Sequence, residues 1–218
     1  MTERNVAVTT HGRYLVIPPS VPGPAPVLVG FHGYAEDAET QLERLHAIPG
    51  SGNWVLVSIQ GLHRFYQRSS NRVVAGWMTR QDRELAIADN LAYVQCCLEA
   101  IAAEWEVLPA VVFAGFSQGV AMAYRAAANA TCPAAGVIAN GGDIPPELTR
   151  DQLKRIPAAV VLRGKDDQWY TREKFREDER RLRESSVNVQ AIEFDGAHEW
   201  RTEDGAALSK FLCERIPS

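Results

Sequence analysis

The sequence lacks an uninterrupted apolar run long enough to cross a bilayer, since Arg125 breaks its most alanine-rich segment. Its first twenty residues also lack the apolar stretch of a secretory signal peptide. Cysteine is scarce, and the spacing of Cys96, Cys97, Cys132 and Cys213 resembles no zinc site. We therefore expect a cytoplasmic protein without a membrane span, whose thiols are reduced and buried in apolar surroundings.

An excess of basic residues is also missing. The chain has 23 Lys and Arg against 27 Asp and Glu, and no basic run with interleaved aromatic residues. Nucleic acid is therefore not an expected partner. One segment does gather positive charge, in the four residues Arg64, Arg68, Arg72 and Arg80. These could favour an anionic substrate, although a solvated arginine-rich loop is the commoner arrangement.

The apolar segments that are present predict a sheet. With 218 residues, 46% of them hydrophobic, the chain can form one α/β domain over 1–218 with a full core. Apolar runs predict strands at 27–31, 54–59, 111–115, 135–139, 158–162 and 189–194. Such continuous runs are typical of a parallel sheet with helices on both faces. Residues 14–17, followed by Pro18 and Pro19, predict an antiparallel edge strand.

Helical segments alternate with these strands, at about 38–47, 82–104, 118–128, 172–184 and 204–215. This alternation predicts a doubly wound, mostly parallel α/β fold. Two connections, 60–81 and 141–157, are longer than a minimal turn. Because both follow parallel strands, we expect them at the carboxyl edge of the sheet, where such folds bind ligands.

The most informative segment is Gly115-Phe116-Ser117-Gln118-Gly119, between a predicted strand and a predicted helix. G-x-S-x-G in that context is typical of a nucleophile elbow, a tight turn that lifts the serine from the sheet. The two glycines would let strand and helix approach closely. Serine is also a favoured helix N-cap, so the five letters alone leave both interpretations open. The flanking elements favour Ser117 as a nucleophile.

A serine nucleophile needs a histidine base and a carboxylate that orients it. In α/β-hydrolases the carboxylate and then the histidine follow the serine, and His198 is the only histidine after Ser117. Asp166 and Asp167 both follow the strand before the one that leads to His198. We favour Asp167, because G-x-x-D is the spacing in related hydrolases, with Asp166 as a turn residue. Asp143 is a weaker alternative.

Backbone N–H groups should form the oxyanion hole. One is that of Gln118, directly after the nucleophile, and the other should come from the loop after an early strand. Here residues 32–35, His-Gly-Tyr-Ala, follow the strand at 27–31, so the Tyr34 N–H is the expected second donor. His32 precedes the serine, and we interpret it as structural.

The motifs HGYAED, GFSQG, GKDD and GAH, in this order, resemble the phospholipase/carboxylesterase family of α/β-hydrolases, small serine esterases that include the acyl-protein thioesterases. The resemblance extends from about Val27 to the C-terminus. It implies an α/β-hydrolase fold without a separate cap domain and a triad of Ser117, Asp167 and His198. It further implies a small ester or thioester substrate, no metal or other cofactor, and a homodimer.

The sequence departs from this family in loops that would contact substrate. Ala35 stands where the family usually has a second glycine, and the prolines usual after the next strand are absent. The predicted substrate-binding residues are Phe65, Tyr66, Trp77, Met78 and Trp169. These side chains either line an acyl pocket or only pack the loops. A peptidase or lactone hydrolase with the same triad, or a non-catalytic ligand-binding protein on the same fold, remain alternatives.

Overall fold

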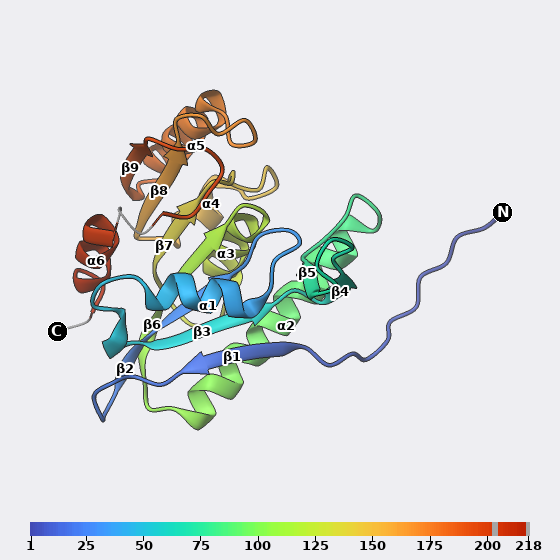
Figure 1. The fold of residues 1–218 in the computed structure, drawn as a ribbon, viewed down its shortest axis with the longest axis horizontal. Helices are drawn as coiled ribbons and strands as arrows, with labels where there is room; N and C mark the ends of the chain where they lie inside the picture. Colours follow the sequence, from blue (N-terminus) through green and yellow to red (C-terminus); the bar gives the residue numbers. More distant parts are fainter. Residues whose placement is uncertain (202–204, 217–218) are drawn as a thin grey trace.

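The computed structural model describes residues 1–201 and 205–216 (Figure 1). A seven-stranded sheet forms its centre, in the order β1-β3-β2-β6-β7-β8-β9. The strands are β1 (Arg13–Ile17), β2 (Ala25–Phe31), β3 (Val55–Gln60), β6 (Val107–Phe116), β7 (Ala134–Asn140), β8 (Ala158–Gly164) and β9 (Asn188–Phe194). Only β1, which pairs with β3, runs antiparallel in this sheet of the described residues. The predicted parallel sheet and its antiparallel edge strand are therefore confirmed.

Helices cover both faces of the sheet. They are α1 (Ala38–His46), α2 (Arg83–Glu104), α3 (Gln118–Asn129), α4 (Arg150–Leu153), α5 (Arg172–Glu184) and α6 (Gly205–Cys213), with a 3₁₀ turn η1 at Ser51–Asn53. One core layer takes its helical side chains from α2, α3, α4 and α5, and the other takes them from α1 and α6. The fold is that of an α/β-hydrolase, and the described residues include no separate cap domain.

The strand order reverses direction between the neighbouring strands β2 and β6. From β2 the chain passes to β3 on one side, and it later returns to β6 on the other. Phe31 at the end of β2 lies beside Gly115 near the end of β6. Open α/β sheets bind ligands where the strand order reverses in this way, outside the carboxyl ends of the strands.

Two segments contain elements that the sequence did not predict, and one predicted boundary is untested. Residues 60–81 contain an antiparallel hairpin, β4 (His63–Tyr66) with β5 (Val73–Gly76), and Ala75 of β5 also pairs with Glu36 in the loop after β2. Residues 141–157 contain the short helix α4, which has a capping box at Thr149. The predicted start of the last helix, residue 204, lies outside the described residues.

The expectation that the cysteine thiols are buried is confirmed for one cysteine and wrong for two others. Cys97 is buried and Cys132 half-buried, but Cys96 and Cys213 are exposed. Adjacent residues on a helix point about 100° apart, so α2 buries Cys97 and exposes its neighbour.

Helix α2 differs from the expectation that no segment could cross a membrane. By length and composition alone, this helix is long and apolar enough to do so. However, its apolar residues Val94, Leu98 and Ile101 belong to the core cluster, as they do in helices that pack on a sheet.

Candidate active site

Ser117 lies in a strained turn between β6 and α3. Its backbone angles are φ 52° and ψ −119°, a region that costs a residue with a side chain on the order of 1–3 kcal/mol. A side chain at Gly119 would meet the Phe31 carbonyl at 2.0 Å, and one at Gly115 would meet the Gly119 carbonyl at 2.4 Å. The two glycines therefore let β6, β2 and α3 approach closely enough to form the turn.

A chain of hydrogen bonds joins three side chains from separate loops. The Oγ of Ser117 lies 2.8 Å from Nε2 of His198, and Nδ1 of His198 lies 2.7 Å from Oδ2 of Asp167. The His198 ring is partly exposed and also packs on the ring of Phe116, with centroids 5.1 Å apart. The structure thus brings together the three residues predicted to form a triad.

The surroundings of Asp167 separate it from the other two aspartates. Its side chain is buried, and its Oδ1 accepts hydrogen bonds from the backbone N–H groups of Trp169, at 2.8 Å, and Tyr170, at 2.9 Å. Asp166 is exposed, and Asp143 is an exposed partner of Lys174. Only Asp167 is therefore in position to orient His198.

The loops after β8 and β9 are tied to each other, which sets this pairing. The backbone N–H of Lys165 donates to the Phe194 carbonyl, and that of Asp166 donates to the Gly196 carbonyl, both at 2.9 Å. Asp166 thus acts through its backbone as a turn residue, as predicted. This pairing of the two loops brings the side chain of Asp167 to His198.

The loop after β2 presents an unused backbone donor at the same edge. Among the described residues, the Tyr34 N–H makes no hydrogen bond, whereas the N–H groups of Gly33, Ala35 and Glu36 all do. Gln118 is the first residue of α3, so its N–H has no acceptor within the helix. The two donors predicted for an oxyanion hole are therefore free to bind an anion.

An ion pair that the sequence analysis missed supports this loop. The Glu36 carboxylate accepts from the Gly33 N–H at 2.7 Å and binds both terminal nitrogens of Arg44, at 2.6 and 2.7 Å. The Arg44 guanidinium in turn lies 4.3 Å from the centre of the Phe116 ring. Both residues lie in or just after the loop, but nothing in their spacing shows that α1 folds back onto it.

His32 is structural, as predicted. Its Nε2 accepts a hydrogen bond from the Gly61 N–H at 2.9 Å, and its Nδ1 lies 2.7 Å from the Gly33 carbonyl. Burial lowers the pKa of His32. The ring is therefore neutral with its proton on Nδ1, and it joins the loops that follow β2 and β3.

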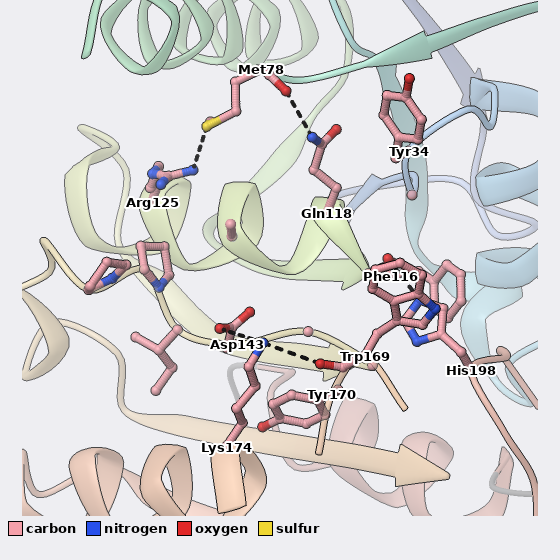
Figure 2. A pocket seen from close by; sticks show the side chains of 18 of the residues that line it. Tyr34, Met78, Phe116, Gln118, Arg125, Asp143, Trp169, Tyr170, Lys174 and His198 are labelled. Carbon is pink, nitrogen blue, oxygen red and sulfur yellow. Dashed lines mark hydrogen bonds and ion pairs between the residues drawn. The ribbon is translucent and has the colours of Figure 1, made fainter. Parts of the chain in front are cut away.

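A cavity of about 710 Å³ opens beside Ser117 and His198 (Figure 2). Of the predicted substrate-binding residues, Met78 and Trp169 line it. Phe65 instead packs against Tyr34, with ring centroids 5.6 Å apart, and is not part of the cavity wall; nor is Tyr66. Tyr34, in the loop after β2, does line the cavity, so Phe65 packs behind a wall residue.

The prediction for Trp77 is wrong. Its side chain is fully buried, and its indole N–H donates to the His32 carbonyl at 2.9 Å. The Gln118 side chain fixes this segment, because it accepts from the Trp77 N–H at 2.8 Å and donates to the Met78 carbonyl at 3.0 Å. Residue 77 is thus held inward while residue 78 borders the cavity.

The four arginines between residues 64 and 80 lie away from this cavity. None of them lines it, and Arg72 is paired with Asp37 at 2.6 Å while Arg64 donates to the His11 carbonyl. The solvated interpretation of this segment is the one that the geometry favours.

Comparison with known proteins agrees with this architecture. The sequence profile described as "Phospholipase/Carboxylesterase" matches residues 16–215, so the chain belongs to that family of α/β-hydrolases. No curated protein sequence matches the chain. Membership of the family supports an ester or thioester hydrolase activity.

Similar solved structures include a carboxylesterase from Bacillus cereus, with a TM-score of 0.76 at 13% identity over 94% of this chain and 95% of that one. They also include an acyl-protein thioesterase 2 from Zea mays, with a TM-score of 0.70 at 16% identity over 95% of this chain and all (100%) of that one. At such low identity these likenesses establish the fold alone.

Proposed function

We propose that this protein is a serine hydrolase that cleaves carboxylic esters or thioesters through a covalent acyl-enzyme. The observation that carries the proposal is the hydrogen-bonded chain from Asp167 through His198 to Ser117. The strained elbow and the two free N–H groups of Tyr34 and Gln118 support it, because acyl transfer needs both an exposed nucleophile and an oxyanion hole.

In the first step, the Ser117 oxygen attacks the carbonyl carbon of the ester while His198 Nε2 takes the hydroxyl proton. The N–H groups of Tyr34 and Gln118 bind the resulting oxyanion, and each donor is worth about 3 kcal/mol. The Asp167 carboxylate stabilises the imidazolium through its hydrogen bond to Nδ1. When the tetrahedral intermediate collapses, His198 gives the proton to the departing alcohol or thiol.

In the second step, His198 takes a proton from water, whose oxygen attacks the acyl-serine carbonyl. Collapse of this second intermediate releases the carboxylic acid and returns the proton to Ser117. In both steps His198 must be neutral to accept the proton.

Covalent labelling tests the nucleophile. A fluorophosphonate probe should label the wild-type protein and leave Ser117→Ala unlabelled, and Ser117→Ala and His198→Ala should each lower turnover by about 10⁴ or more. The matched control is Ser70→Ala, which removes an exposed hydroxyl and should label as the wild type does. Folded wild-type protein that takes up no probe would refute the proposal.

A substrate panel separates the related activities. It contains p-nitrophenyl esters of two to sixteen carbons, a thioester, a lactone and a peptide amide. We expect the esters or the thioester to be cleaved best, whereas fastest cleavage of the lactone or the amide would favour a lactone hydrolase or a peptidase.

A further inference from the structure

The cavity follows one face of α3 away from the nucleophile. Ser117, Ala121 and Arg125 all line it, and their spacing of four residues places them on the same side of the helix. At 1.5 Å per residue, the Cα atom of Arg125 lies about 12 Å along the helix from that of Ser117. Helical side chains tilt toward the N-terminus, so the guanidinium lies somewhat nearer to the nucleophile.

Arg125 is a buried cation with donors left over. Only 2% of the residue is exposed. Its Nε and Nη2 bind Oε1 of Glu147 at 2.7 and 2.6 Å, but Nη1 contacts only the sulfur of Met78, at 3.8 Å, among the described residues (Figure 2). A thioether is a weak acceptor and its side chain is flexible, so a carboxylate would displace Met78 readily.

The charge at this end of the cavity is not balanced. Glu147 also binds Arg83, at 2.9 Å between Oε2 and Nη2, so that one carboxylate faces two guanidinium groups. Arg83 lines the cavity as well. The charged side chains elsewhere in the wall do have partners of opposite sign, Glu36 with Arg44 and Lys174 with Asp143.

We propose that the Arg125 end of the cavity is a carboxylate subsite, and that the substrate is an ester or thioester of a dicarboxylic acid. This proposal rests on the proposed hydrolase function. The free carboxylate would bind Nη1 of Arg125 and the exposed edge of Arg83, while the esterified carboxyl lies at Ser117. Guanidinium groups bind carboxylates through charge-assisted hydrogen bonds, which are stronger than neutral ones.

The acyl half of the substrate, rather than the leaving group, points to Arg125. The leaving group must accept a proton from His198, and His198 and Arg125 lie at opposite ends of the view in Figure 2. The Cα atoms of Ser117 and Arg125 lie about 12 Å apart along α3. With C–C bonds of about 1.5 Å, an extended acyl chain between these two residues has roughly six to ten carbons. The cavity wall is apolar at Ala121, which lies between Ser117 and Arg125 along α3, and at Ile144, and it suits such a chain.

The test compares two substrates that differ in the charge of one end. They are the mono-p-nitrophenyl ester of octanedioic acid and the same compound with its free carboxyl methylated. Wild-type protein should have the higher kcat/KM for the charged ester, with the difference mainly in KM, since the subsite binds ground state and transition state alike. The preference should weaken in 0.5 M salt.

Three variants locate the effect. Arg125→Met should lower the preference for the charged ester about 10- to 100-fold, as expected for loss of hydrogen bonds to a charged group. Arg83→Gln should lower it less, and it also serves if Arg125→Met does not fold. The matched control is Arg180→Gln, the same change of charge on the exposed face of α5, which should leave the preference unchanged.

Two outcomes would overturn the subsite. One is a wild-type protein that hydrolyses p-nitrophenyl octanoate but does not prefer the charged ester. The other is a preference that persists in both folded Arg125→Met and Arg83→Gln. Either result leaves the proposed hydrolase function standing, whereas a protein that cleaves no ester and takes up no fluorophosphonate at Ser117 loses both proposals.

Discussion

The two ends of the cavity are built in opposite ways. At the Ser117 end, the reactive side chains already have their partners, and the free donors are backbone N–H groups fixed by a strained turn and a braced loop. At the Arg125 end, the free donor belongs to a side chain covered by a flexible methionine. Fixed geometry at the first end suits the chemistry that we propose there, and the adjustable second end suits the proposed binding of a carboxylate.

The largest expected effect tests which carboxylate belongs to the catalytic end. Asp167→Asn should lower kcat about 10⁴-fold, because an amide at this position favours the wrong histidine tautomer. Asp166→Asn is the matched control, since Asp166 contributes a backbone N–H and its side chain is exposed. Steady-state kinetics on p-nitrophenyl esters measures both, and a severe loss in Asp166→Asn alone would show that the carboxylate assignment is mistaken.

The second prediction concerns Asp178, which joins two segments of the cavity wall. Its Oδ2 accepts from the Ile144 N–H at 3.1 Å and from the hydroxyl of Tyr170, whose backbone N–H binds Asp167, at 2.9 Å. Burial raises the pKa of Asp178 from 3.8 to about 7, with Asp143 adding to the rise and Arg181 opposing it.

The folded protein therefore keeps a proton on Asp178 that the unfolded chain loses near pH 4. This group stabilises the fold below that pH, and its contribution is lost as pH rises toward 7. At about 1.4 kcal/mol per pKa unit, the loss is at most roughly 4 kcal/mol. Asp178→Asn should remove this part of the fall in the free energy of unfolding, measured by urea denaturation from pH 4 to 8. Parallel curves for the two proteins would contradict the prediction.

A smaller effect is expected where the oxyanion loop is braced. Glu36→Ala removes the acceptor for the Gly33 N–H and the partner of Arg44, so the Tyr34 N–H should lose its fixed position. We expect kcat to fall about 10- to 100-fold, less than or comparable to the loss of a whole oxyanion donor, with little change in KM. Glu39→Ala, which breaks an exposed pair with Arg13, should keep kcat near the wild-type value. Equal kinetics in the two variants would argue against the brace.

The smallest effect concerns backbone strain in the same loop. Ala35 has φ 59°, a conformation that glycine adopts without cost. Ala35→Gly should therefore raise the free energy of unfolding by about 0.5–1 kcal/mol without lowering kcat. Ala92→Gly, at an exposed position in the middle of α2, should have the opposite sign, because glycine destabilises a helix interior by about 1 kcal/mol. A destabilised Ala35→Gly would mean that the alanine methyl group makes contacts that outweigh the strain.

Local features were predictable from the sequence because their causes lie within a few residues. The elbow needs an apolar strand, two glycines and a helix start, all present between residues 111 and 127. The sheet needs only continuous apolar runs, and its edge strand is marked by the prolines after residue 17. The hairpin at 63–76 was missed, because part of its support is the bridge from Glu36, which is distant in the sequence.

What the sequence by itself determined is the fold class, the family, the elbow at Ser117 and the short set of residues eligible to act with it. Only the tertiary structure placed the Asp167 carboxylate against His198, buried Trp77 in the core, and set Arg125 against Glu147 at the far end of the cavity. The reason is physical: patterns of apolarity and turns act between near neighbours, whereas hydrogen bonds and ion pairs join side chains that only folding brings together.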